Sequence, residues 1–120
     1  MTKWNVEYTD EFEAWWNTLS ARAQSAVGAT VEMLIREGPQ LDRPHADTLY
    51  GSKITNLKEL RSRDGRSHFR TLFAFDPRRT AILLIAGDKA GDDRFYERMI
   101  PLAEQLYEAY LNDLKREGEI

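Results

Sequence analysis

The first part of the chain alternates apolar and polar positions with two different periods. From Trp4 to Tyr8 every second residue is apolar, which indicates a short β-strand with one buried face. Thr9 or Asp10 can then cap a helix, and apolar residues recur at helical spacing from Phe12 to Leu19. The change of period predicts a strand followed directly by a helix.

A second helical pattern starts after Ser20, which can cap it, and keeps its apolar phase through Leu34. Gly38 and Pro39 end it, because glycine suits the position after a helix and proline cannot continue one. The short turn between the two helices predicts an antiparallel pair. Their apolar faces need a sheet to cover.

Residues Gln40–Gly51 are interpreted as an ordered loop that Leu41, Leu49 and Tyr50 pin to the body. Three β-type runs follow: Ile54–Arg61, His68–Phe75 and Thr80–Ala86. They are separated by the turn signals Ser62–Gly65 and Asp76–Arg79, so they predict an antiparallel meander. The third run is apolar throughout and is expected to be buried on both faces.

The last third predicts one long helix. A flexible connection at Gly87–Gly91 leads to Asp92 or Asp93, where the helix opens, and an apolar stripe then runs to Leu114. Pro101 lies off that stripe and should kink the helix or begin a second segment. The expected order is β-α-α-β-β-β-α, an α+β fold in one domain over residues 1–120, with the helical hairpin on one face of the sheet.

Composition limits the possible functions. The 120 residues contain no cysteine, which excludes disulfides and thiolate metal sites, and only two histidines; no metal and no cofactor is expected. No apolar run is long enough to span a membrane, and the N-terminus lacks the apolar core of a secretory signal. A cytoplasmic protein is therefore expected.

Charge is distributed unevenly. The stretch Lys53–Lys89 contains nine Lys or Arg and four Asp or Glu, a net charge of +5, whereas the whole chain carries −3 and the remainder therefore −8. A basic sheet in an acidic chain indicates a polyanionic partner.

Arg70 lies inside an otherwise apolar strand, where an unpaired charge is rarely found. Alternation places Glu59 and Arg61 on one face of the neighbouring strand. One interpretation is an ion pair between Glu59 and an arginine. The other is an anion site formed by Arg70, Arg61 and Lys89, with Glu59 as a general base whose pKa the arginines tune.

Other candidates surround this group. Tyr96, beside Phe95 at the start of the last helix, is either core or a stacking platform for a base. The additional residues expected to bind RNA are Lys58, His68, Arg78 and Arg79. His68 is alternatively an acid/base group or a surface histidine, and His45 has no companion.

The sequence contains no phosphate-binding loop, dinucleotide fingerprint, nucleophile elbow or zinc-protease motif. Metal-free chemistry by Arg, Lys, Glu, Tyr and His remains. Cleavage of RNA suits this set, because the substrate's own 2′-OH can act as the nucleophile.

The segments N-L-K-E-L-R, F-R-T-L-F-A-F-D and I-A-G-D-K, in this order of elements, resemble the RelE/ParE superfamily of bacterial toxins. The resemblance covers nearly the whole chain and is strongest to the HigB-like, phage-associated branch. It implies a metal-independent mRNA endonuclease that can depend on the ribosome. It also implies a cognate antitoxin, commonly with a helix-turn-helix DNA-binding domain. The ParE branch instead inhibits DNA gyrase, and a non-catalytic relative is a further alternative.

The resemblance maps the family's strand arginine to Arg70, its last basic residue to Lys89, and its aromatic residue to Phe95 or Tyr96. Family members often carry lysine where this chain has Glu59. The hypothesis is therefore a site in which Glu59 is the base, Arg61 and Arg70 hold the scissile phosphate, Lys89 stabilises developing charge, and Tyr96 or His68 stacks or donates a proton.

Overall fold

A computed structural model describes residues 3–120, so Met1 and Thr2 lie outside the described residues. Its elements are β1 (Val6–Tyr8), α1 (Asp10–Trp16), α2 (Ala21–Glu37), the 3-10 turn η1 (Gly38–Gln40), β2 (Ala46–Thr48), β3 (Lys58–Asp64), β4 (Ser67–Phe75), β5 (Ala81–Asp88) and α3 (Phe95–Arg116). The predicted α+β class and order of elements are confirmed, with β2 as an added strand.

The strands form one sheet in the order β1-β5-β4-β3-β2. β3, β4 and β5 are the expected antiparallel meander. β1 lies parallel to β5, which makes the sheet mixed. β2 pairs antiparallel with β3, so the prediction of a strandless loop over Gln40–Gly51 is wrong. Three residues are too few for a periodic pattern to reveal a strand.

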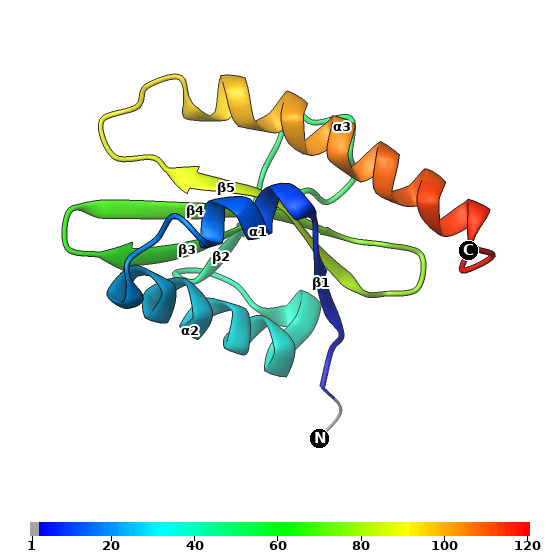
Figure 1. The fold of residues 1–120 in the computed structure, drawn as a ribbon, viewed down its shortest axis with the longest axis horizontal. Coiled ribbons are helices and arrows are strands. Elements are labelled where there is room, and N and C mark those ends of the chain that lie inside the picture. The colour runs from blue at the N-terminus through cyan, green and yellow to red at the C-terminus, as the bar shows by residue number, and fades with distance from the viewer. Residues whose placement is uncertain (1–2) are drawn as a thin grey trace.

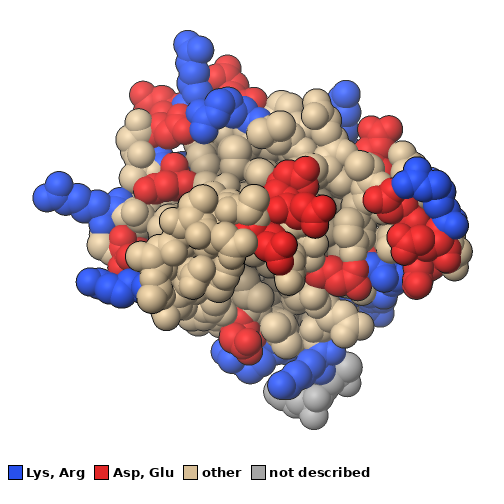
Figure 2. Space-filling view, in the orientation of Figure 1, with Lys and Arg blue, Asp and Glu red and all other residues tan. Residues whose placement is uncertain are grey.

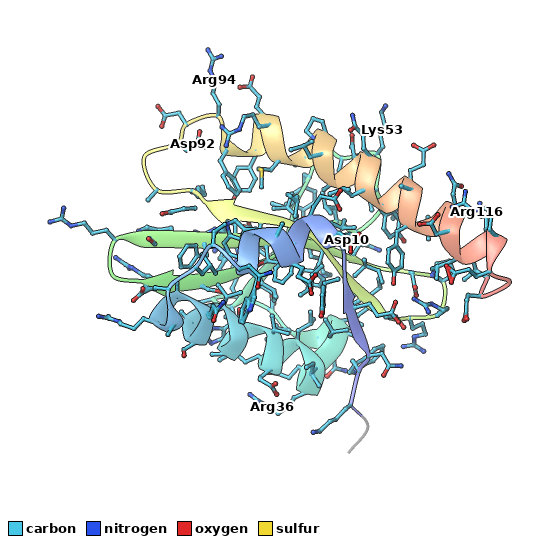
Figure 3. The ribbon with its side chains drawn as sticks, in the orientation of Figure 1. Asp10, Arg36, Lys53, Asp92, Arg94 and Arg116 are labelled. Atoms are coloured by element: carbon cyan, nitrogen blue, oxygen red, sulfur yellow. The ribbon has the colours of Figure 1, made fainter. Side chains whose placement is uncertain are left out.

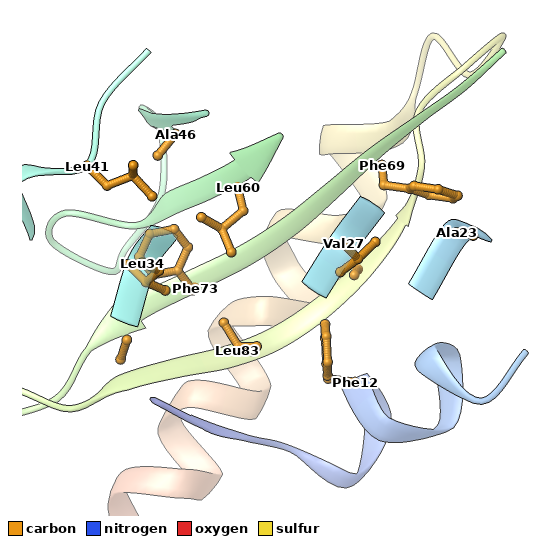
Figure 4. Packing of buried hydrophobic residues seen from close by; sticks show 12 residues of the cluster. Phe12, Ala23, Val27, Leu34, Leu41, Ala46, Leu60, Phe69, Phe73 and Leu83 are labelled. Atoms are coloured by element: carbon orange, nitrogen blue, oxygen red, sulfur yellow. The ribbon is translucent and has the colours of Figure 1, made fainter. Parts of the chain in front are cut away.

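Helices cover both faces of the sheet (Figure 1). α1 and α2 run in opposite directions on one face, and α3 lies along the other (Figure 1). On the first face Phe12, Val27 and Leu34 pack on strand residues such as Leu60 and Phe73 (Figure 4). On the second face the buried residues are Leu57, Leu72, Ala74, Ile82, Leu84, Phe95, Met99 and Ala103. β5 is therefore buried on both faces, as its apolar run predicts.

Side chains cap the first two helices. Thr9 Oγ1 accepts a hydrogen bond from Phe12 N at 3.0 Å and donates one to Leu84 O at 2.6 Å. Thr9, rather than Asp10, is therefore the cap of α1, and it also ties the helix to β5. Ser20 caps α2 as predicted, with its Oγ accepting from Ala23 N at 3.2 Å.

Two strand boundaries differ from the sequence prediction. β3 begins at Lys58 rather than Ile54, because Asn56 has a φ of 62° and cannot continue an extended strand. β3 also extends through Asp64, so the turn is narrower than Ser62–Gly65. Tyr50 is 86% exposed and does not pin the preceding segment, whereas Leu41 is buried.

β5 reaches Asp88, so part of the connection predicted at Gly87–Gly91 is strand. α3 begins at Phe95, after Asp92 and Asp93, and continues to Arg116 with Pro101 inside it, so no second segment begins there. Pro101 is tolerated near the start of the helix because the carbonyl it leaves without a partner belongs to Glu97, in the exposed first turn. None of the helices within residues 3–120 has the length and apolar character that crossing a membrane requires.

Candidate functional site

β3 and β4 place three of the predicted site residues on the face covered by α3. In the register of the two strands, Arg61 lies opposite Arg70, and Glu59 lies opposite Leu72. Leu72 packs against α3, and side chains alternate along a strand, so Glu59, Arg61 and Arg70 share the α3 face. The predicted face is confirmed.

The Glu59 carboxylate is the centre of this group and is 1% exposed. Tyr96 OH donates to its Oε1 at 2.6 Å, and Arg61 Nε donates to its Oε2 at 3.1 Å. Arg70 Nε lies 3.7 Å from Oε1. A buried carboxylate requires such partners, because burial without them would cost several kcal/mol. The ion-pair interpretation of Glu59 is therefore present in the structure, and both of its oxygens are engaged.

The Arg70 side chain is held in place, but one N–H group of its guanidinium has no hydrogen-bond partner among residues 3–120. Its side chain is 13% exposed, and Nη1 donates to the Phe69 carbonyl at 3.0 Å. Its Nε is buried with no hydrogen-bond partner within the described chain. Buried donors are nearly always paired; this one faces Glu59 Oε1 at 3.7 Å, beyond hydrogen-bond distance, so Arg70 adds positive charge beside Glu59 without a direct hydrogen bond to it.

Tyr96 connects the buried group to the surface. Burial, followed by the hydrogen bond to Glu59, raises the pKa of Tyr96 to about 12. Its hydroxyl therefore stays protonated at neutral pH and can donate a proton or a hydrogen bond. Lys89 Nζ lies 5.7 Å from the centre of the Tyr96 ring, within cation–π range.

A pocket of about 470 Å³ opens beside this ring and is called the Tyr96 pocket below. It is lined by His68, Lys89, Ala90, Gly91, Asp92, Asp93 and Tyr96. The Asp88 carboxylate accepts from the backbone N–H groups of His68 and Ala90, at 2.9 and 3.0 Å, which fixes the loop that carries Lys89. Figure 3 labels Asp92 and Arg94 where this loop enters α3.

The other face of the sheet is different. Seen from the side of α1, the middle of the surface carries acidic side chains and most basic ones lie around its edge (Figure 2). Asp10, Glu11 and Glu13 of α1 are all exposed. A polyanion would be repelled from the acidic middle of this surface.

The structure brings together Glu59, Arg61, Arg70, Lys89, Tyr96 and, at the pocket wall, His68. It does not bring the remaining candidates there. Lys58 points to the opposite face, with Nζ 3.4 Å from Thr48 Oγ1. Arg78 is ion-paired with Asp76 and Glu7, and Arg79 lies over the Trp4 ring.

Asp47 is a site residue that the sequence did not suggest. Its Oδ2 accepts from Arg61 Nη2 at 3.1 Å and from Arg43 Nε at 3.0 Å. The hydrogen bond from Arg43 is the main cause that lowers the pKa of Asp47. The signal was absent because Asp47 reaches Arg61 only through the pairing of β2 with β3.

The described residues offer little for a metal. Within residues 3–120 no group of three or more His, Cys, Asp or Glu side chains could hold an ion. The groups that the structure gathers at this site are arginines, a lysine, a tyrosine and a histidine around the buried Glu59 carboxylate.

Comparisons with a family model, with related sequences and with solved structures agree with one another. The family model described as "Phage derived protein Gp49-like" matches residues 14–108. A Mycobacterium tuberculosis protein named as toxin HigB3 is 43% identical over 102 residues, which cover 84% of this chain and 88% of that protein. A second protein from that organism, named as toxin HigB2, is 42% identical over 110 residues and 90% of this chain. The chain spans only 54% of the length of HigB2.

Among solved structures, a mutant of the Escherichia coli toxin RelE in the free state matches with a TM-score of 0.56. The match covers 81% of this chain and 95% of RelE, at 9% sequence identity. At this identity the similarity establishes a RelE-like fold.

Proposed function

Because this chain belongs to the phage-derived Gp49-like family and to the HigB-like branch of the RelE/ParE toxins, we propose that it is the toxin of a toxin–antitoxin pair and cleaves mRNA without a metal. It would act in the cytoplasm, where its substrate is. The observation that supports this proposal is the excess of cationic donors around Glu59, directly beside an open pocket.

In this proposal the scissile phosphate binds between Arg70, Arg61 and Lys89. Attack of the 2′-OH on phosphorus forms a 2′,3′-cyclic phosphate and breaks the bond to the 5′-oxygen. Preorganised cations stabilise the charge that develops on the phosphate oxygens. One proton leaves the 2′-OH and another must reach the leaving oxygen.

The pocket offers two groups for these proton transfers. We assign Tyr96, whose raised pKa of about 12 keeps it protonated at neutral pH, the role of supplying a proton to the leaving oxygen. His68 lines the same pocket, and an imidazole nitrogen can accept a proton, so we assign His68 the role of the base. We assign Glu59 a positioning role in place of the base predicted from the sequence, because its carboxylate is buried and both oxygens have partners.

The test is cleavage of defined RNA by the purified chain, with free message in the presence of a chelator and, separately, with ribosome-bound message in the Mg²⁺ that ribosomes require. The expected products end in a 2′,3′-cyclic phosphate, and a 2′-deoxy nucleotide at the cut site should block cleavage. Arg36→Ala, an exposed arginine on α2, is the matched control and should cleave normally. Intact RNA under every condition would refute the proposal, and inhibition of DNA supercoiling would support a gyrase inhibitor instead.

The antitoxin is part of the same proposal. Lys89 at the Tyr96 pocket, with Arg61 and Arg70 beside Glu59, would attract an acidic segment of a helix-turn-helix antitoxin, which would block access to the site. Where a small helix-turn-helix protein is encoded beside this chain, coexpressing the two should restore growth and protect RNA. Growth arrest that persists when the neighbouring protein is coexpressed would contradict the antitoxin part of the proposal.

A further inference from the structure

A second pocket contains Lys58 and Arg79, two of the three predicted RNA-binding cations that the first pocket leaves out. It has a volume of about 380 Å³ and is lined by Trp4, Asn56, Lys58, Phe75 and Arg79, among others; it is called the Trp4 pocket below. Phe75 ends β4, whereas His68 lies near its start, and seven residues of strand span about 23 Å at ~3.3 Å each. The two pockets therefore lie near opposite ends of the central strands.

The cations of the Trp4 pocket have no acidic partners. Across residues 3–120, Lys58 and Arg79 form no ion pair, and Lys58 Nζ has only the Thr48 hydroxyl nearby. Their neighbour Arg78 is paired with two carboxylates. The basic turn before β5 thus contains one arginine that is neutralised and one that is available for an anion.

Arg79 is held in a fixed place. Its guanidinium carbon lies 5.1 Å from the centre of the Trp4 ring. That ring packs edge-on against Phe75, with 5.8 Å between centroids, and against Gly38, where an added Cβ would lie 2.3 Å from it. A guanidinium stacked on a fixed aromatic ring is preorganised to bind a phosphate through two donors.

The backbone gives an independent indication. In the described chain, Asn56 and Arg79 are the non-glycine residues with positive φ, at 62° and 68°, and both line this pocket. Asparagine adopts this conformation readily, but arginine does so at a cost that glycine would avoid. Backbone strain of this kind is concentrated at functional sites. The arginine at position 79 is explained if its side chain has a use.

From these observations we infer that the Trp4 pocket is a second phosphate subsite for the RNA strand, with Lys58 and Arg79 as its ligands. This inference rests on the proposed function. A strand bound at both pockets would pass the β2 edge of the sheet, where Arg61 and the largely exposed Arg43 lie. The subsite would lengthen the footprint of the RNA without taking part in cleavage.

The test is binding of a single-stranded RNA oligonucleotide whose 2′-hydroxyls are all methylated, so that it cannot be cleaved. The double variant Lys58→Ala/Arg79→Asn removes both charges, and asparagine retains the left-handed turn. We expect about tenfold weaker binding, and a salt dependence of log K that is lower by about 0.7 for each lost contact. Lys115→Ala, an exposed lysine near the end of α3, is the control and should bind like the wild type.

Arg79→Lys keeps the charge and should recover most of the salt dependence. Cleavage of a dinucleotide too short to reach the Trp4 pocket should be equal in the wild type and the double variant. Unchanged binding and salt dependence in the double variant would overturn the subsite. The subsite would also be overturned if the double variant bound RNA normally but no longer bound polyglutamate. That result would assign the pocket to an acidic protein.

The two proposals can fail separately. If the wild type cleaves no RNA but the double variant binds the methylated oligonucleotide more weakly, the subsite stands and the catalytic proposal falls. If RNA is cleaved and the double variant binds it fully, only the subsite is wrong.

Discussion

Two clusters, each with a tyrosine, a glutamate and arginine, lie along α3. Near its start, the hydroxyl of Tyr96 donates to the carboxylate of Glu59. Four turns later, at a position 14 residues on and so on the same side of the helix, Tyr110 donates to Glu7. Each carboxylate also contacts arginine. The labels of Arg94 and Arg116 in Figure 3 mark the two ends of the helix near which these clusters lie.

The clusters differ in their balance of charge. At the Tyr110 end one arginine, Arg78, lies between the fully buried Asp76, at 2.7 Å, and Glu7, at 3.1 Å. At the Tyr96 end Glu59 faces two arginines, of which Arg61 is also paired with Asp47, and a lysine lies beyond the tyrosine. The Tyr110 cluster is saturated with acid and fastens α3 to β1, whereas the Tyr96 cluster has cationic donors to spare. Under the proposed function, the Tyr96 cluster is therefore the one expected to bind the substrate anion.

The largest expected effect comes from removing Arg70, the less exposed of the two arginines beside Glu59. Arg70→Ala should lower RNA cleavage by about 100- to 1,000-fold, the usual cost of losing a preorganised donor to developing charge. Because Glu59 keeps Arg61 and Tyr96, the variant should remain folded. Cleavage rates measured beside those of Arg78→Ala, assayed while folded, would check this. Equal losses in the two variants would erase the distinction between the clusters.

The opposite effect is expected at the Tyr110 cluster. Arg78→Met should lower the free energy of unfolding by about 3 kcal/mol, because it leaves the buried Asp76 carboxylate without its counter-ion. Urea denaturation measures this. The further change Asp76→Asn should recover part of the loss, since the uncompensated charge is then gone. An Arg78→Met variant as stable as the wild type would show that Arg78 is not structural.

These differences explain what the sequence could and could not predict. The alternation of β3 and β4 was enough to place Glu59, Arg61 and Arg70 on one face, and the turn signals gave the meander. The partners of Arg78 depend on Glu7, which arrives through the parallel pairing of β1 with β5. Asp47 depends in the same way on β2. Strands of three residues have no readable period, so contacts made through them cannot be predicted from a pattern.

The two tyrosines allow a smaller but more direct comparison. Tyr96→Phe should slow cleavage by roughly 100-fold, the range for losing a general acid, with little change of KM. Tyr110→Phe should leave cleavage unchanged and cost about 1 kcal/mol of stability, the value of one hydrogen bond. Steady-state kinetics and denaturation of both variants would measure this. If Tyr110→Phe slowed cleavage and Tyr96→Phe did not, Tyr110 rather than Tyr96 would be the catalytic tyrosine.

The smallest expected effect is on the titration of Tyr110. Burial, and then the hydrogen bond to Glu7, raises the pKa of Tyr110 from 10.0 to about 12. A raised pKa in the folded state stabilises the fold below about pH 10, and this contribution is lost as the pH rises toward 12. Tyr110→Phe should therefore lose less stability than the wild type over this interval. The difference in tyrosinate absorbance between the two proteins isolates the Tyr110 titration, whose midpoint should lie near pH 12 and should fall in Glu7→Gln. The hydroxyl of Tyr96 is hydrogen-bonded to Glu59 and not to Glu7, so the midpoint of the Tyr96 titration should not move in Glu7→Gln. A shift of both midpoints would mean that the two clusters are coupled through α3.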